Sequence, residues 1–304
     1  MRLVNRRLGL GLLLVAIASF LIIYHQPEPP AAEKTLAAES VFRPTIAFET
    51  VSLTNATLYV LTVPSSYEVT VALAEGLATV RDIAQQTGAI AALNAGFFDP
   101  QNGQTTSYVV HRGELVADPR QNQRLVDNPD LQAYLPQILN RSEFRRYQCA
   151  AETRYNIAAH DAPVPPSCSL IEAIGAGPQL LPADTSETEG FVTYDSGGQQ
   201  VRDALGAQQR NARTAVGILA DGSLVWTVAA QQPQAPTSSG FSLAEMAEFL
   251  RSLGAVQALN LDGGSSSSLY YQGSLSLGRV DPQGNFIERP VHSVLLVHRQ
   301  PEQG

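Results

Sequence analysis

Lysine is almost absent from this chain. Lys34 is the only lysine among the 304 residues, and the other basic side chains are arginine or histidine. Lys34 lies in a Pro- and Ala-rich stretch with the composition of a linker, which excludes lysine nucleophiles and Schiff-base chemistry. Charged residues make up only 16% of the chain, and the formal net charge is −8. A nucleic-acid partner is excluded because it needs a basic face, whereas a few arginines can still hold one phosphate group.

Long apolar runs are also absent, with one exception near the N-terminus. Three arginines precede an uninterrupted apolar run over residues 8–24, which spans about 25 Å as a helix. Residues 1–25 are therefore predicted to be a signal peptide, cleaved near residues 16–18, or an uncleaved signal anchor that spans the membrane. The anchor is favoured because the cleavage site falls inside the apolar run. Residues 26–44 are predicted to be a linker, and the rest of the chain is expected to be exported, facing the periplasm or the extracellular side.

Cysteine is scarce, since the chain contains only Cys149 and Cys168. No cluster of cysteine and histidine has the spacing of a zinc site, and nothing in the sequence requires a metal or a cofactor. An isolated pair at modest separation in an exported protein favours a disulfide, with two free buried thiols as the alternative.

The remaining residues, 45–300, are predicted to form a single α+β domain with a mixed β-sheet flanked by two helices. Short strands separated by turn residues run from residue 46 to residue 73, and the helices are expected at about 75–87 and 242–253. The second helix begins with an S-x-x-E capping box at Ser242. Residues 118–170 are rich in Pro, Asn, Gln and Arg, and we expect them to be an insertion with some helix, closed by the disulfide, without a core of its own.

A short pattern, G-A-[IV]-x-A-L-N, occurs twice. Its copies end at Asn94 and Asn260, and each follows an amphipathic helix and forms a buried strand. Chance similarity between two helix–strand units is one explanation. The other is that two related units lie side by side, so that the segments after Asn94 and Asn260 flank one cleft, since ligand sites commonly form where strands end and loops diverge.

The strongest candidate for chemistry is Asp262, in the segment LNLDGGSSSS. A carboxylate directly after a buried strand is costly unless it reaches a cleft or a partner. Gly263 and Gly264 permit close approach of the backbone to a ligand, and Ser265 and Ser266 offer hydroxyl and N–H groups that could cradle an anion. The alternative is a Gly-rich turn with solvated serines, which does not account for the aspartate.

Other candidates surround this segment in the expected fold. Arg213 begins a strand and could bind a phosphate, and Thr214 beside it could donate a hydrogen bond. Asn94 could bind a sugar hydroxyl or a phosphate oxygen. Phe97 is a candidate stacking platform for a sugar ring, and Gly177 a tight turn close to the ligand. Each also has an ordinary structural role as its alternative.

These segments together resemble the phosphodiester glycosidase family. The resemblance rests on NAGFF, GAGPQLL, ARTAVGI, the stretch from SGFSLAEM to LDGGSSSS and the closing ERPVHSVLLV, and it covers most of residues 46–298 in order. The family includes enzymes that remove N-acetylglucosamine from a sugar phosphodiester and many exported bacterial proteins linked to exopolysaccharide. The chain departs from the family pattern at Ala95 and Ser265, where we associate the family with glycine.

The resemblance implies an exported hydrolase that cleaves a glycosyl-1-phosphodiester in a glycan or envelope polysaccharide. Arg213, Asn94 and the backbone at 264–265 would bind the phosphate leaving group, while Asp262 would act as a base for water or stabilise an oxocarbenium-like carbon. Asp99 is a candidate second carboxylate. One rival is a serine hydrolase using Ser265 or Ser266 with His292, against which the absence of G-x-S-x-G counts. The other is a polysaccharide-binding or envelope-assembly protein that does not cleave.

Overall fold

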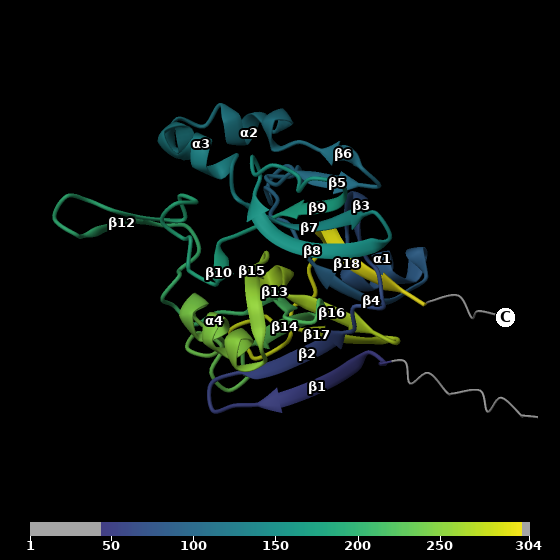
Figure 1. Cartoon of the computed structure of the whole chain (residues 1–304). Coiled ribbons are helices and arrows are strands. Elements are labelled where there is room, and N and C mark those ends of the chain that lie inside the picture. Colours follow the sequence, from purple (N-terminus) through teal and green to yellow (C-terminus); the bar gives the residue numbers. More distant parts are fainter. Residues whose placement is uncertain (1–43, 300–304) are drawn as a thin grey trace, which may run out of the picture. The chain divides into compact units, whose positions relative to one another are not determined.

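The computed structural model of the chain describes residues 44–299 (Figure 1). The predicted signal segment, and the linker up to residue 43, lie outside the described residues. Within residues 44–299, no helix has both the length and the apolar character needed to cross a bilayer. The described part is one domain made mostly of β-strands, with few and short helices, and its strands form three main sheets.

The first sheet is built from strands at both ends of the domain. The first two of the strands expected at the start of the domain belong to it. Their order across the sheet is β1 (Ala47–Ser52), β2 (Thr57–Val63), β14 (Leu224–Ala230), β13 (Arg213–Leu219), β15 (Ala255–Asn260) and β10 (Gln179–Leu181). The predicted second helix, α4 (Leu243–Ser252), lies between β14 and β15 in the chain and begins with the expected capping box at Ser242.

The second sheet holds the other copy of the repeated pattern. Its order is β17 (Ser274–Leu277), β16 (Ser268–Tyr271), β4 (Ala89–Asn94), β18 (Val291–His298) and β3 (Val69–Ala78). Helix α1 (Val80–Thr87) precedes β4, with Thr79 as its N-cap. The helix therefore starts five residues later than predicted, because residues 75–78 continue β3, whose last residue, Ala78, pairs with Val291 of β18.

The third sheet contains much of the predicted insertion. Its order is β6 (Glu114–Ala117), β5 (Val109–His111), β9 (Cys168–Gly175), β7 (Ser142–Cys149) and β8 (Glu152–Ala159). The helical part is confined to short turns: η1 (Pro119–Gln121), α2 (Gln123–Val126), η2 (Pro129–Tyr134) and α3 (Leu135–Ile138). The region has no core of its own, as expected, but it carries more strand than expected.

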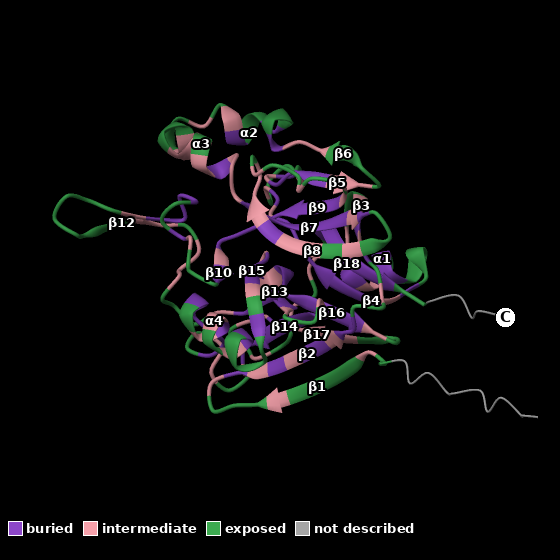
Figure 2. Cartoon of the chain, in the orientation of Figure 1, coloured by how far each residue is buried: buried purple, intermediate pink, exposed green. Residues whose placement is uncertain are grey.

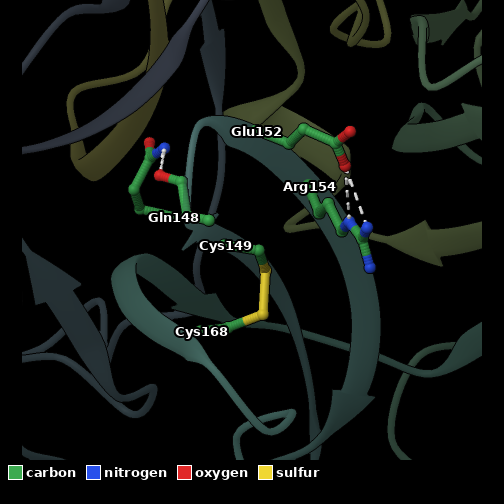
Figure 3. Close-up of a disulfide and its surroundings, with 6 residues drawn as sticks. Gln148, Cys149, Glu152, Arg154 and Cys168 are labelled. Atoms are coloured by element: carbon green, nitrogen blue, oxygen red, sulfur yellow. Dashed lines mark hydrogen bonds and ion pairs between the residues drawn. A yellow bond between two sulfur atoms is a disulfide. The ribbon is translucent and has the colours of Figure 1, made fainter.

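The predicted disulfide is present. Cys149 and Cys168 face each other at the paired ends of β7 and β9, and a disulfide joins them (Figure 3). The bond closes a loop that contains β8, so it fixes the outer strand of the sheet to its neighbours. Arg154 and Glu152 form an exposed ion pair on that strand.

The sheets are not mixed, which corrects the predicted fold class. Every ladder between the named strands is antiparallel. A strand–helix–strand connection often makes two parallel neighbours. Here a third strand fills the gap each time: β18 lies between β3 and β4, and β13 lies between β14 and β15. The intervening strand runs opposite to both neighbours.

One apolar core is shared by all three sheets (Figure 2). Trp226 comes from the first sheet, Leu93 and Leu295 from the second, and Phe144 and Ile174 from the third. The helices cover the outer faces: α4 packs on the first sheet and α1 on the second. The ends of β4, β13 and β15 are thus held rigidly where the first two sheets meet.

A two-stranded arm projects from the domain after β10 (Figure 1). It consists of the antiparallel pair β11 (Val192–Tyr194) and β12 (Gln200–Asp203). Phe191 anchors its base in the interior, since this ring is 1% exposed.

Candidate active site

The repeated pattern ends at one place in space, although its two copies belong to different sheets. Asp262, two residues after β15, donates its N–H to the carbonyl of Ala95, one residue after β4, at 2.8 Å. The loops after Asn94 and Asn260 are therefore in direct contact. Several of the residues predicted from the sequence, among them Asn94, Thr214 and Asp262, lie at this junction of the first two sheets.

Asn94 connects the loops through its side chain. Its Nδ2 donates to the main-chain carbonyl of Asp262 at 2.5 Å. Its Oδ1 accepts from Thr214 Oγ1 at 2.9 Å and from the N–H of Ser268 at 3.0 Å. Asn94 and Thr214 are both fully buried. These two residues therefore hold β4, β13 and the Asp262 loop together, and the amide oxygen of Asn94 is already in use within the protein.

Asp262 itself is half-buried, and its ionisation is strongly affected by its surroundings. Removal of water from around the carboxyl group raises the pKa of Asp262 to about 6, against the effects of the Ser266 hydroxyl, the charge of Arg289 and the N–H of Gly263. A carboxyl with this pKa exchanges protons near neutrality, as a general base must.

The glycines and serines after Asp262 form a tight turn, η3 (Gly264–Ser266). A Cβ on Gly263 would lie 3.0 Å from the carbonyl oxygen of Ala212, so a side chain there would push against the neighbouring backbone. Gly264 has a φ of +60°, which favours glycine. Ser265 and Ala95, where the chain departs from the family pattern, do not have positive φ values.

The predicted anion cradle is smaller than the serine run suggested. The N–H groups of Gly264, Ser266, Ser267 and Ser268 all donate to acceptors within the protein. Among residues 44–299, Ser265 retains a free N–H and a half-buried hydroxyl. The buried hydroxyls of Ser267 and Ser268 have no hydrogen-bond partner in that part of the chain, and the Ser266 hydroxyl is buried beside the Asp262 carboxyl group. Ser265 therefore remains as the residue of this turn that could meet a substrate, because Ser266 is fully buried.

Arg213 is placed differently from the expectation. Its guanidinium is bound by main-chain carbonyls: Nε donates to Phe241 at 3.1 Å, Nη1 to Leu205 at 3.0 Å, and Nη2 to Gly206 and Gln209 at 2.6 and 3.0 Å. The residue is 3% exposed, and burial lowers its pKa to about 10. With four of its five N–H groups occupied, Arg213 supports the 205–209 loop instead of being free to hold a phosphate. This corrects the predicted role.

Arg289 is the cation that the sequence reasoning missed. It lies just before β18, and its Nη1 donates to Ser265 Oγ at 3.1 Å. Its guanidinium lies 4.8 Å from the ring centroid of Phe98, and its positive charge acts on Asp262. It forms no ion pair within residues 44–299. Arg289 is part of the closing ERPVHSVLLV motif, but no pattern in the sequence distinguishes this arginine from the others as a site residue.

Phe97 and Gly177 lie beside the junction. Gly177 and Asn260 are joined twice, since the N–H of Gly177 donates to Asn260 O at 2.9 Å and Asn260 Nδ2 donates to Gly177 O at 2.8 Å. A side chain on Gly177 would collide with Glu189 and Phe191. Phe97 is half-buried, and its ring lies 5.8 Å from that of Phe191. Phe97 and Gly177 therefore both lie at the edge of the junction, as the sequence predicted for residues close to a ligand.

Two further candidates are engaged elsewhere. Asp99 forms an ion pair with Arg124 at 2.7 Å and accepts from the N–H of Gln101, so it stabilises its own turn. His292 lines a separate cavity of about 220 Å³ with Thr105 and Asn122. Ser265 does not line that cavity, so the structure gives the serine-hydrolase rival no nucleophile–base pair. Among the described residues there is also no group of three or more His, Cys, Asp or Glu side chains that could hold a metal ion.

The fold and this junction define a known class. The family model for phosphodiester glycosidases matches residues 87–298, and the chain belongs to this family. The resemblance first noted from the motifs is thereby confirmed.

Two N-acetylglucosamine-1-phosphodiester alpha-N-acetylglucosaminidases are similar to this chain, one in sequence and one in fold. The mouse (Mus musculus) N-acetylglucosamine-1-phosphodiester alpha-N-acetylglucosaminidase is 28% identical over 242 residues, which are 73% of this chain and 40% of that protein. The chain thus spans about two fifths of its curated relative's length. A solved structure of the zebrafish N-acetylglucosamine-1-phosphodiester alpha-N-acetylglucosaminidase catalytic domain, auto-inhibited by its pro-peptide, matches with a TM-score of 0.61. It is 19% identical, with 86% of this chain and 85% of that one covered.

A protein from Synechocystis shares the fold as well. Its crystal structure matches with a TM-score of 0.53 at 18% identity and covers 84% of this chain and 64% of its own. At this identity the likeness concerns the fold alone.

Proposed function

We propose that this protein is a hydrolase that cleaves a glycosyl-1-phosphodiester, releasing a sugar from a phosphate-linked acceptor. The observation that carries the proposal is Asp262, a half-buried carboxyl with a pKa of about 6 at the junction of two strand ends, with Arg289 beside it. The family and the name of the mouse relative support the choice of substrate class.

In the proposed reaction the bond between the anomeric carbon and the phosphate oxygen breaks, and its electron pair stays on the phosphate. Water attacks the anomeric carbon and gives its proton to ionised Asp262, whose charge also stabilises the positive charge that develops on the sugar. The products are a free sugar and a phosphate monoester of the acceptor. Phosphate is a stable anion, so its departure needs little help from a general acid.

The departing phosphate needs a cation and hydrogen-bond donors. We assign these roles to the guanidinium of Arg289 and to the hydroxyl and N–H of Ser265, because these groups lie together and are not saturated by the protein. Phe97 is assigned to the face of the sugar ring. Asn94 and Thr214 then act by positioning the 262–265 turn, whereas Arg213 holds the 205–209 loop.

Export is part of the same proposal. A disulfide persists outside the reducing cytosol, so the bond between Cys149 and Cys168 supports it. The predicted anchor at residues 1–25 would place the domain on the outer side of a membrane, where exopolysaccharide and envelope glycans are found. Expression with a reporter enzyme that is active only outside the cytoplasm, fused after residue 304, tests this placement.

The activity is tested with the full chain purified in detergent and a panel of sugar-1-phosphate methyl esters. Release of reducing sugar is followed for wild type and for Asp262→Asn, with a chelator present in one set. Wild type is expected to cleave at least one ester, and Asp262→Asn to bind it without cleavage. Binding without cleavage by wild type across the panel would instead favour the non-catalytic polysaccharide-binding function.

A further inference from the structure

Two arginines outside the Asp262 site converge on the turn at the base of the arm. Arg141, which directly precedes β7, donates from Nε to the carbonyl of Glu189 at 3.2 Å. Arg202, in β12, donates from Nε to the next carbonyl, that of Gly190, at 2.9 Å. Residues far apart in the chain therefore bring two positive charges to consecutive peptide groups.

Each guanidinium lies on an aromatic ring. The distance from Arg141 Cζ to the ring centroid of Phe191 is 3.7 Å, and that from Arg202 Cζ to Tyr134 is 4.3 Å. Stacking on a ring fixes the plane of a guanidinium while leaving its N–H edge available, and that edge is the part that binds carboxylate or phosphate.

Neither arginine has a carboxylate partner within residues 44–299. The carboxylate of Glu189 is nearby, but its oxygens already accept from the hydroxyl of Ser142 at 2.7 Å and its N–H at 3.2 Å, from the N–H of Gln179 at 3.1 Å and from the hydroxyl of Thr185. It holds the turn in place and leaves the terminal nitrogens of both arginines without a hydrogen bond in the described part of the chain.

Burial and the neighbouring charge of Arg202 lower the pKa of Arg141 to about 9, with Glu189 opposing them. Arg141 is still cationic at neutral pH. Two half-buried like charges held close together are costly, and an anion between them would relieve that cost. Arg146 and Arg145, by contrast, both pair with buried glutamates in the same sheet.

The arginine pair is connected to the Asp262 site by a row of rings. Phe191, on which Arg141 stacks, lies 5.8 Å from Phe97, and Phe97 follows the Ala95 carbonyl that binds the N–H of Asp262 by two residues. Arg289 stacks on Phe98, the second phenylalanine of the NAGFF motif. The arginine pair is thus separated from Phe97 by one ring, that of Phe191, while Arg289 contacts the residue next to Phe97 in the chain.

We propose that Arg141 and Arg202 form a subsite for a second anionic group of the substrate, a carboxylate or a phosphate separate from the scissile phosphodiester. This inference rests on the proposed function and adds a specificity to it. The anionic group belongs either to the sugar, as in a uronic acid, or to the acceptor, and the chemistry of recognition is the same for both.

The test compares matched esters that differ by one charge. One pair consists of the methyl and carboxymethyl phosphodiesters of the same N-acetylhexosamine, which places the charge on the acceptor. The other pair consists of the methyl phosphodiesters of glucose-1-phosphate and of glucuronate-1-phosphate with its carboxylate free, which places the extra charge on the sugar. Dissociation constants are measured by calorimetry in the full chain carrying Asp262→Asn, so that binding is read without turnover, and KM is measured in the active protein.

In the parent background one of the esters that carry the extra carboxylate is expected to bind about tenfold more tightly than its partner, which carries only the phosphodiester charge; this is the effect of one charge-assisted contact. Arg141→Gln and Arg202→Gln should each remove most of that preference and leave the binding of the ester without the carboxylate unchanged, whereas Arg141→Lys should retain part of it. Arg154→Gln is the matched control, because it removes an exposed charge from the same sheet as Arg141 (Figure 3).

Tighter binding of the carboxymethyl ester than of the methyl ester assigns the subsite to the acceptor. Tighter binding of the glucuronate ester than of the glucose ester assigns it to the sugar. The inference is overturned if the parent protein shows no preference in either pair, if the preference survives both glutamine variants, or if these variants weaken the binding of esters with and without the extra carboxylate equally. Failure of the proposed function gives a different result, namely esters that bind with the predicted preference and are not cleaved.

Discussion

The side-chain amide of Asn94 donates a hydrogen bond to the main-chain carbonyl of Asp262, 168 residues further along the chain. This bond joins the ends of two strands that belong to different sheets, and it determines where the Asp262 carboxyl group lies. The geometry of the site therefore depends on an internal amide that itself has little room to touch a substrate.

The first prediction concerns that amide. Asn94→Asp keeps the acceptor for Thr214 and Ser268 but removes the donor to Asp262 O and adds a buried negative charge. We expect the free energy of unfolding to fall by about 1–3 kcal/mol, the cost of an unsatisfied buried group, and kcat to fall more than KM rises. Urea denaturation and steady-state kinetics check this. A variant with normal stability and normal kcat would show that the junction does not position Asp262.

Arg213 is predicted to matter for stability more than for substrate affinity. Removing its guanidinium leaves four main-chain carbonyls without their donor, that of Phe241 in a buried position and the other three partly buried. Arg213→Met should lower the free energy of unfolding by about 3 kcal/mol, and Arg213→Lys should rescue little because a lysine cannot reach all four. The KM of the protein that remains folded should change less than threefold. A large rise in KM at unchanged stability would restore Arg213 as a phosphate ligand.

The opposite pattern is expected for Arg289. Its guanidinium is half-buried, contacts Ser265 Oγ and has no carboxylate partner in the described chain, so the fold depends on it little. Arg289→Gln should raise KM for a phosphodiester about tenfold or more, with unfolding changed by less than about 1 kcal/mol. Calorimetric binding of inorganic phosphate gives a second measure. If phosphate binds equally well to the variant, the assignment of Arg289 is wrong.

The sequence predicted the outline of this site better than its contacts. Asp262 and Asn94 could be found because a carboxylate and an amide at the ends of buried strands are unusual in themselves. The bonding of Arg213 could not be found, because its partners lie in the 205–209 loop and at Phe241, and no local pattern predicts how that loop folds back. Arg289 was missed for a similar reason, since its role comes from its closeness to Ser265.

In the fold, too, local features could be predicted from the sequence, whereas pairings between distant segments could not. Strands, hairpins, the capping box at Ser242 and the disulfide are local features or depend on few residues, and they were predicted correctly. The antiparallel sheets were not, because β18 pairs between β3 and β4 from more than 190 residues away. The start of α1 was misplaced because Leu77 fits the helical spacing of the apolar residues 80, 83 and 84 but belongs to a strand that continues to Ala78.

The ionisation of Asp262 should control both stability and rate. Its pKa in the folded protein, about 6, exceeds the ordinary value of 3.8, so the folded state binds the proton more tightly than the unfolded state. The free energy of unfolding should therefore fall as pH rises from about 4 to 6, by roughly 1–3 kcal/mol in all. Asp262→Asn should lack this loss and be the more stable protein at pH 7. Equal pH dependence of unfolding in both proteins would contradict the raised pKa.

The rate should have the complementary dependence. Because the ionised carboxylate is the reactive form, kcat/KM should increase about tenfold per pH unit below pH 6 and level off above about pH 7. A profile that is flat between pH 4 and 7 would remove Asp262 from the role of base.

The most direct test is the kcat of Asp262→Asn on a sugar-1-phosphate methyl ester that wild type cleaves, with Arg154→Gln as the control for purification and folding. Loss of a general base that also stabilises charge should reduce kcat by about 10³-fold or more, while the dissociation constant of the ester changes by less than threefold. Cleavage by Asp262→Asn at a rate close to that of wild type would contradict the account of this site.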